Sequence, residues 1–90
     1  MTENSAQAQR TDLETELRGI VSEVGAIPPD FNATAHFYND LGMASVKALH
    51  LLMGLEDRYG IQIQDEDFVN ATSLERLSSL VKRLLADAAQ

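Results

Sequence analysis

Apolar residues recur at helical spacing in three separate segments of this chain, and this pattern limits the possible folds more than any other feature. The first segment follows Thr11 and Glu14, which have the spacing of a helix N-terminal capping box, and it ends at Gly25. The second segment spans 45–59, and the third spans about 73–87, where leucines repeat every three or four positions. The spacing predicts three longer amphipathic helices.

The connection between the first two helices is expected to be unusually long. Pro28 and Pro29 prevent the first helix from resuming, so a loop is predicted from about 25 to 44, with Gly25 as a left-handed helix cap. A loop of this length in a small domain is normally functional or held by its own side chains. We expect it to be held by five core side chains, which are Ile27, Phe31, Phe37, Tyr38 and Leu41.

The second half of the chain contains one further, shorter element. Gly60 is a plausible stop for the second helix, and the acidic segment 65–69 predicts a short helix of one or two turns. Thr72 and Glu75 have capping-box spacing at the start of the last helix. The predicted fold class is therefore all-α: a four-helix bundle with three longer helices, a short third helix and a long first loop.

The length and composition indicate one domain. Ninety residues are near the lower size at which a hydrophobic core supports a fold without disulfides or metal, and the chain has no cysteine. An apolar fraction of 44% with only 6% aromatic residues suits an aliphatic helical core. We expect residues 1–8, which are mostly polar, to form a disordered tail and residues 9–88 to form the single domain.

The charge of the chain excludes several classes of partner. Fourteen acidic residues against seven basic ones give a formal net charge of -7, which disfavours nucleic acid and anionic lipid surfaces and favours basic protein surfaces. No apolar run approaches the roughly 20 residues of a membrane span, and the N-terminus does not resemble a secretion signal. We expect a monomeric, soluble, cytoplasmic protein that binds neither nucleic acid nor membranes.

Few residues in the chain could carry chemistry. His36 and His50 are isolated, and there is no cysteine, no glycine-rich phosphate loop and no carboxylate pair beside a plausible base. Neither histidine has a second metal ligand at helical spacing, so no metal site is predicted. We expect no catalytic activity.

The most informative segment is Asp40-Leu41-Gly42-Met43-Ala44-Ser45-Val46, where a serine stands between a glycine-containing loop and the most apolar helix. A phosphodiester on Ser45 would meet free backbone N–H groups and the positive end of the helix dipole, which stabilise an anion by roughly 0.3–1 kcal/mol. The simpler alternative is that Ser45 only caps the helix, as most serines at such positions do.

The segment DLGMASVKALHLLMGLEDRYGIQIQDEDF resembles the acyl carrier protein family, the phosphopantetheine-binding carrier proteins, around its modified serine. The resemblance implies a 4′-phosphopantetheine arm attached to Ser45 by a phosphopantetheinyl transferase, with the cargo held on the arm's thiol as a thioester. The carrier would then present its acyl group to a loading ligase and to downstream acyl-processing enzymes. Because the arm brings its own thiol, the resemblance also explains the absence of cysteine.

Three departures from the family pattern suggest a specialised member with its own partners. The residue before the serine, usually Asp, is Ala44, and the following helix has Lys47 and His50 where acidic residues are common. Acidic residues remain further along the chain. The residues predicted to contact partner enzymes are Asp40, Met43, Ala44, Val46, Lys47, His50, Glu56, Asp57, Asp65 and Glu66.

The sequence leaves the nature of the cargo open. An aminoacyl or peptidyl carrier loaded by an adenylating ligase shares the serine and the arm, and an unmodified carrier-like interaction subunit is a third alternative. We expect a cargo chain to enter the bundle only partly. Its expected lining is Leu49, Leu52, Met53 and Leu55, with space left by Gly54.

Overall fold

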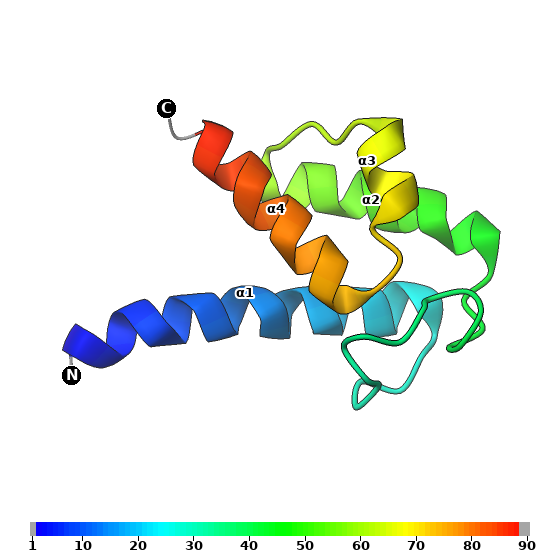
Figure 1. Ribbon diagram of the computed structural model, residues 1–90, viewed down its shortest axis with the longest axis horizontal. Helices are drawn as coiled ribbons and strands as arrows, with labels where there is room; N and C mark the ends of the chain where they lie inside the picture. Colours follow the sequence, from blue (N-terminus) through cyan, green and yellow to red (C-terminus); the bar gives the residue numbers. More distant parts are fainter. Residues whose placement is uncertain (1, 89–90) are drawn as a thin grey trace.

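The computed structural model describes the backbone of residues 2–88 and the side chains of residues 13–88. Within this part of the chain there are helices and no strand (Figure 1). The elements are α1 (Thr2–Gly25), α2 (Ser45–Tyr59), α3 (Asp65–Asn70) and α4 (Leu74–Ala88). The prediction of an all-α chain with a long first loop and a short third helix is confirmed.

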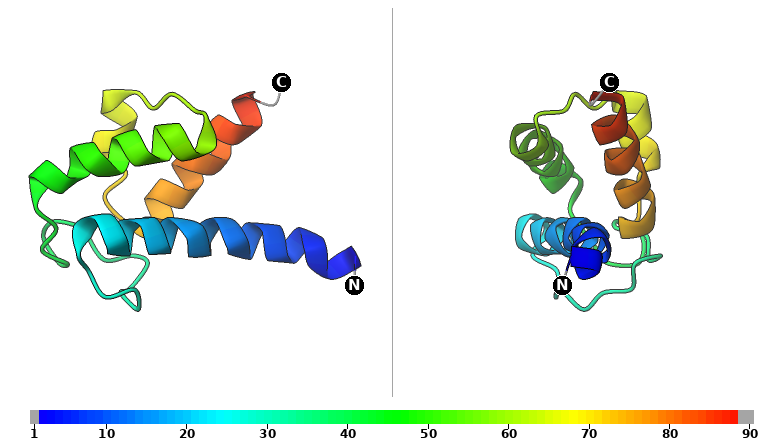
Figure 2. Two further views of the ribbon diagram at one scale, coloured as in Figure 1. Left: turned by 180° about the vertical axis from the view of Figure 1, so that it is seen from behind. Right: turned by 90° about the vertical axis from the view of Figure 1, so that its left-hand side faces the viewer.

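The three longer helices enclose the core. Helix α2 runs antiparallel to α1, and α4 crosses beside both, so that the three form a triangle when viewed along α1 (Figures 1 and 2). The short helix α3 lies against α4. The largest fully buried side chains come from all three longer helices and from the first loop, and they are Phe37, Leu17, Leu51, Leu55, Leu74, Leu77, Val21 and Val81.

Helix α1 begins earlier than the sequence predicts. It starts at Thr2, so Thr11 lies inside the helix and its predicted role as the N-terminal cap is wrong. Residues 2–8 have a helical backbone where a disordered tail is predicted, and the reason is that residues 2–18 contain neither glycine nor proline. Met1 lies outside the described residues. The domain boundary at residue 9 stays a prediction.

The end of α1 differs from the prediction in one residue. The left-handed conformation is adopted by Ala26, with φ of 56°, and not by Gly25. Gly25 instead packs closely against the end of a flexible side chain, because a Cβ atom there would lie 2.9 Å from the Cε atom of Met43 and that atom would have to shift. The backbone N–H of Ile27 donates to the carbonyl of Ser22 at 3.0 Å and closes the helix end.

The loop 26–44 is held by the apolar side chains that the sequence predicted. Ile27, Phe31 and Phe37 are buried, and Tyr38 and Leu41 pack partly buried against the same core. Their burial provides the free energy that orders a segment without regular structure. This prediction is confirmed.

Hydrogen bonds join the same loop to its neighbours. The N–H of Phe37 donates to the carbonyl of Thr72 at 2.7 Å, and the N–H of Glu75 donates to the carbonyl of Ala33 at 3.0 Å. From α1, the Arg18 guanidinium donates to the carbonyls of Pro29 and Phe31, and it lies 4.7 Å above the Phe31 ring. The loop is therefore tied to α1 and to the start of α4.

Helix α4 is capped by Ser73, so the prediction of a capping box on Thr72 is wrong. The Ser73 hydroxyl accepts the N–H of Arg76 at 3.2 Å, and Ser73 is buried. The carbonyl of Thr72 accepts the N–H of Phe37 from the loop, and Thr72 lies before the helix. Gly60 ends α2 with φ of 63° and donates to the carbonyl of Glu56 at 2.9 Å, as predicted.

Helix α2 buries less of its apolar surface than the sequence suggests. Leu51 and Leu55 have no exposed surface, whereas Leu49 and Met53 are each 58% exposed. A Cβ atom on Gly54 would meet nothing within 4 Å, so this glycine faces open space. The predicted cargo lining is therefore wrong for Leu49, Met53 and Gly54, because these residues lie on the outer face of the helix.

The two faces of α2 predict a contrast between two identical substitutions. Leu51→Ala removes a fully buried side chain and should lower the free energy of unfolding by about 2–5 kcal/mol. Leu49→Ala, on the exposed face, should change it by less than about 0.5 kcal/mol. Urea denaturation followed by circular dichroism measures both. Equal losses for the two variants would contradict the assignment of faces.

A polar contact joins the end of α2 to α1. The Tyr59 hydroxyl donates to Glu16 Oε1 at 2.9 Å, and Arg58 Nη2 lies 3.4 Å from Glu16 Oε2. Partial burial, followed by the hydrogen bond and charge of Glu16, raises the pKa of Tyr59 to about 12. Because the neutral phenol is the favoured form, this contact is fully present below about pH 10 and is lost as the pH rises through the folded-state value.

This contact predicts how Tyr59 titrates. In a Tyr38→Phe background, Tyr59 should ionise with a midpoint near pH 12, measured by phenolate absorbance. Glu16→Gln should move the midpoint back toward the ordinary value near 10. Circular dichroism at each pH serves as the control that the helices remain folded. A midpoint near 10 in the folded protein with Glu16 intact would contradict the contact.

Candidate functional site

Ser45 is the first residue of α2, and its side chain is exposed. The residue before the helix is Ala44, which has an extended backbone with φ of -71° and ψ of 139°. No side-chain hydrogen bond caps the start of the helix. Within the described part of the chain the Ser45 hydroxyl makes no hydrogen bond. The alternative that Ser45 only caps the helix is therefore not what the structure shows.

The first turn of α2 suits an anion. It contains no acidic residue, and no side chain occupies its N–H groups as a cap, although the N–H of Lys47 donates to the carbonyl of Ala44 at 2.9 Å. Lys47 itself is half-buried in this turn. The N–H groups of a helix start and its dipole both favour negative charge.

The residues before Ser45 bring it from the core to the surface. Gly42 adopts φ of 72°, which favours glycine, and Met43 follows with only 4% of its side chain exposed. The N–H of Met43 donates to the carbonyl of Phe37 at 2.9 Å. With Met43 held in this way, Ala44 and Ser45 emerge at the surface.

The turn that precedes Gly42 is closed by two side chains. His36 Nδ1 accepts the backbone N–H groups of Tyr38 and Asn39, at 3.2 and 3.1 Å. Asp40 Oδ2 accepts the N–H of His36 at 2.9 Å. Asp40, predicted to contact partners, is exposed, and its carboxylate also stabilises this turn.

The predicted docking residues fall into two groups. Met43 is buried, so its predicted docking role is wrong, because its side chain fills the core beside Gly25. Glu56 is half-buried and accepts the N–H of Ile63 at 2.9 Å, so its carboxylate holds the loop after α2. The exposed or half-buried remainder consists of Ala44, Val46, Lys47, His50, Asp57, Asp65 and Glu66.

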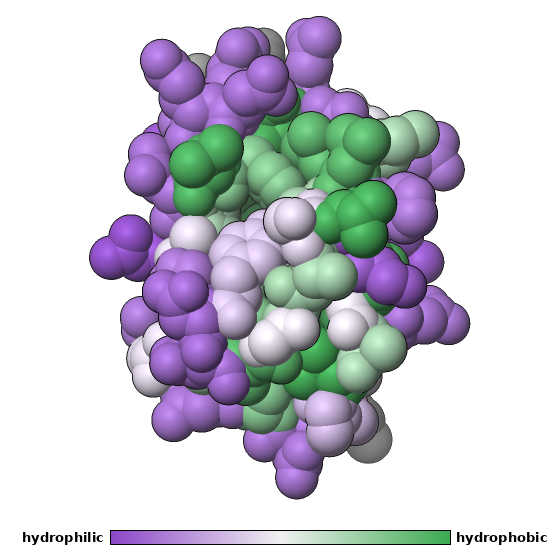
Figure 3. All heavy atoms as spheres, turned by 90° about the vertical axis from the view of Figure 1, so that its right-hand side faces the viewer, coloured by the Kyte–Doolittle hydropathy of each residue, from purple (hydrophilic) through white to green (hydrophobic). Residues whose placement is uncertain are grey.

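The start of α2 presents apolar side chains at the surface. Val46 is 65% exposed, and Leu49 and Met53 follow it at helical spacing with 58% each. The end of the molecule where α2 begins shows apolar side chains among polar ones (Figure 3). The prediction for partner contacts missed Leu49 and Met53, although their spacing from Val46 was a usable signal. An exposed apolar stripe of this kind indicates an interaction surface.

The other described serines differ from Ser45 in exposure or in their bonds. The Ser22 hydroxyl donates to the carbonyl of Ile27, Ser73 caps α4, and Ser78 is buried. Ser79 is exposed, but it lies in the middle of α4. Among residues 13–88, Ser45 is thus the serine that combines exposure with a helix start.

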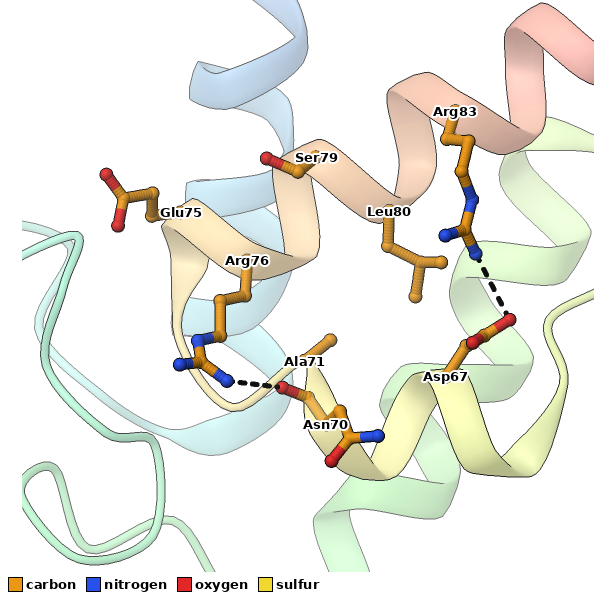
Figure 4. Close-up of a pocket in the computed structure, with 8 residues that line it drawn as sticks. All are labelled: Asp67, Asn70, Ala71, Glu75, Arg76, Ser79, Leu80 and Arg83. Carbon is orange, nitrogen blue, oxygen red and sulfur yellow. Dashed lines mark hydrogen bonds and ion pairs between the residues drawn. The ribbon is translucent and has the colours of Figure 1, made fainter.

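A hollow between α3 and α4 is separate from this site. Its volume is about 580 Å³, and it includes no residue of α2 or of the loop 26–44. Arg83 Nη2 lies 3.2 Å from Asp67 Oδ2, and Arg76 Nη1 donates to the carbonyl of Asn70 at 3.4 Å (Figure 4). The hollow is open, and two of its polar side chains, Arg83 and Asp67, already bind each other.

The structure brings together few groups that could carry other chemistry. Within residues 13–88 no cluster of three or more histidine, aspartate and glutamate side chains is arranged to hold a metal ion. No helix in the described part of the chain has the length and hydropathy needed to cross a membrane.

The free hydroxyl predicts a contrast with the buried cap of α4. Ser45→Ala should change the free energy of unfolding by less than about 0.5 kcal/mol, because no hydrogen bond is lost. Ser73→Ala removes a helix cap and should cost about 0.5–2 kcal/mol. Chemical denaturation of both variants tests this. A loss at Ser45 as large as that at Ser73 would mean that the Ser45 hydroxyl does cap α2.

Comparison with known protein families agrees with this geometry. The model of the family described as the phosphopantetheine attachment site matches residues 15–81, which is most of the chain. The cofactor of such a domain is covalently attached 4′-phosphopantetheine. An exposed serine hydroxyl at an uncapped helix start free of carboxylates fits the phosphodiester of that group. The chain belongs to the phosphopantetheine attachment site family of carrier proteins.

Proposed function

We propose that the arm is attached to Ser45 and that the protein is an acyl carrier, which holds an acyl group as a thioester and presents it to pathway enzymes. The observation that carries this proposal is the position of Ser45, which is exposed, makes no hydrogen bond with the described residues and begins α2. The family match over residues 15–81 supports the same class of function.

The chain's own residues have limited roles in this function. When a transferase moves the arm from coenzyme A, Ser45 Oγ forms a bond to the phosphorus that carries the pantetheine. The pyrophosphate P–O bond of coenzyme A breaks, adenosine 3′,5′-bisphosphate leaves, and the serine proton is released to a base. The N–H groups of the first turn and the nearby Lys47 then stabilise the phosphodiester charge. The thiol at the end of the arm supplies the thioester, since the chain has no cysteine.

We infer that partner enzymes contact the outer face of α2. The face is next to Ser45, and its apolar side chains are exposed without a partner among the described residues. Apolar anchors surrounded by polar residues are typical of protein interfaces. The partners include the phosphopantetheinyl transferase, a loading ligase and acyl-processing enzymes. The proposed contact residues are Ala44, Val46, Lys47, Leu49, His50 and Met53.

An acyl cargo is preferred to an aminoacyl cargo because the segment from Asp40 to Phe68 resembles the acyl carrier proteins. Intact mass spectrometry of the carrier isolated with its loading ligase distinguishes the two. A mass increment equal to an amino acid would favour the aminoacyl or peptidyl carrier. An unmodified protein that supports its pathway with Ala at position 45 would favour a carrier-like interaction subunit.

The attachment site predicts the result of enzymatic modification. Incubation with a broad-specificity phosphopantetheinyl transferase, coenzyme A and Mg²⁺ should add one phosphopantetheinyl group, and peptide mapping should place it on Ser45. Ser45→Ala should abolish the addition.

Ser79→Ala is the matched control, because Ser79 is also exposed but lies within α4. This variant should be modified at the wild-type rate. The proposal fails if the group is found on Ser79, or if no group is added under conditions that modify a standard acyl carrier.

The charge of the α2 face predicts weak recognition by enzymes adapted to acidic carriers. A triple variant with Ala44→Asp, Lys47→Asp and His50→Glu should bind a housekeeping phosphopantetheinyl transferase more tightly than the wild type. Exposed ion pairs contribute about 0.2–1 kcal/mol each, so three altered positions should give a gain of about 0.6–3 kcal/mol, or roughly 3- to 150-fold. The gain should appear mainly in kcat/KM at low ionic strength and decrease with added salt.

A single-residue comparison separates local from overall charge. Lys47→Asp changes the α2 face, whereas Lys82→Asp makes the same change of charge at an exposed position on α4. We expect a gain from the first variant and little change from the second. Equal effects of the two would show that net charge, and not the α2 face, governs recognition.

A further inference from the structure

The His36 imidazole closes the turn that leads to Ser45 in a way that depends on its protonation. Its Nδ1 atom accepts two backbone N–H groups, from Tyr38 at 3.2 Å and from Asn39 at 3.1 Å. An imidazole nitrogen that accepts hydrogen bonds carries no proton, so the ring is neutral with its proton on Nε2. Protonation of Nδ1 would place a third donor against these two donors.

The turn is also closed at its backbone. The N–H groups of Asp40 and Leu41 both donate to the carbonyl of His36 at 3.0 Å. Asp40 Oδ2 in turn accepts a hydrogen bond from the N–H of His36. His36 and Asp40, the first and fifth residues of the turn, therefore cap each other. This arrangement resembles the reciprocal capping box of helices. His36 is therefore the residue on which both ends of the turn depend.

The turn connects directly to the attachment serine. It is followed by Gly42, in the left-handed conformation, and by Met43, which is bonded to the carbonyl of Phe37 at 2.9 Å. Phe37, within the turn, and Met43, after it, are buried anchors. Between them Tyr38 and Leu41 are partly buried against the core, whereas Asn39, Asp40 and Gly42 are exposed, so the side-chain caps act together with this burial to fix the path of the turn.

We propose that His36 is a positioning residue whose neutral imidazole holds the turn 36–41, and through it Ser45, in the conformation that partner enzymes recognise. The proposal rests on the assignment of Ser45 as the attachment site. The cap requires the neutral ring, because protonation of Nδ1 removes the acceptor. Protonation of His36 would therefore slow modification of Ser45.

The surroundings of His36 offer one competing interaction. On its own loop, the Tyr38 ring lies edge-on with its centroid 5.7 Å from that of the imidazole, and the Asp40 carboxylate binds the His36 backbone. The elements joined to the loop carry Glu75, at the start of α4, and Lys47, in α2. Neither forms an ion pair or hydrogen bond with the imidazole in the described structure. The Asp40 carboxylate binds the backbone N–H of His36, and it forms no ion pair or hydrogen bond with the imidazole in the described structure.

The cap is tested by NMR between pH 8 and pH 5. The amide resonances of Tyr38 and Asn39 should shift together, with the same midpoint as the His36 ring. His36→Asn keeps a side-chain acceptor two bonds from Cβ but cannot be protonated in this range, so it should abolish both shifts. His50, which is exposed on α2, serves as an internal control, because no hydrogen bond joins its ring to these amides in the described structure. Unchanged Tyr38 and Asn39 amides in the wild type would overturn the proposal.

The consequence for Ser45 is tested by modification rates with a broad-specificity phosphopantetheinyl transferase and coenzyme A. The ratio of wild-type rate to His36→Asn rate removes the pH dependence of the transferase. This ratio should be lower wherever the ring is protonated, and complete loss of the cap should lower it about fivefold, the effect of losing a typical helix cap. His36→Ala should be slowed at both pH values, and His36→Asn should restore the rate.

The outcomes separate this proposal from the attachment site itself. A constant ratio, or a His36→Ala variant modified as fast as the wild type, would overturn the role of His36 while leaving Ser45 as the attachment site. Absence of modification in every variant at both pH values would refute the attachment site. The amide titration would then still decide whether His36 caps the turn.

Discussion

The burial of Phe37 is the interaction on which the position of the functional site depends. Its side chain is 1% exposed, its N–H is bonded to Thr72 between α3 and α4, and its carbonyl receives the N–H of Met43 just before α2. One residue of an irregular loop thereby joins the start of α4 to the start of α2. Without such an anchor the loop 26–44 would retain its conformational entropy, and α2 would begin at an undefined place relative to the core. Ser45 is held at a fixed position because the loop before it is packed like a core element.

Helix α2 has one buried face that contributes to stability and one exposed face that we propose as the contact surface for partners. Leu51 and Leu55 carry the burial that attaches the helix to α1, whereas Val46, Leu49 and Met53 remain in solvent. Such exposure adds nothing to the stability of the isolated domain, and a contiguous apolar surface is a liability for aggregation. We infer that a partner covers this apolar surface and the serine at once. On that proposal, docking uses side chains that the fold itself does not require.

The sequence predicts the elements of the fold well and their contacts less well. Helical periodicity, glycine and proline locate α2, α3 and α4 within one or two residues, because these signals are local. The sequence does not predict which face of α2 is buried, because apolar residues occur on both sides of the helix. The packing of α1 and α4 determines which of these residues are buried. Met43 is buried in close contact with Gly25. The cap of α4 is Ser73 and not Thr72, whose carbonyl accepts the N–H of Phe37. For the site, the motif locates Ser45, but the cap on His36 required knowledge of the turn.

The charge around Ser45 has two opposing requirements, and this chain meets one of them in an unusual way. An acidic residue at position 44 would help a carrier bind a basic partner, but it would place a negative charge next to a negative phosphodiester. With Ala44 before the helix, Lys47 in the first turn and no acidic residue there, a phosphodiester on Ser45, as we propose, would be stabilised by the chain itself. On the same proposal, binding to partners draws more on the apolar side chains of α2 and less on charged residues beside Ser45, although the chain as a whole has a net charge of -7. The overall charge would then attract a basic partner over long range, and the apolar face next to Ser45 would hold it in the complex.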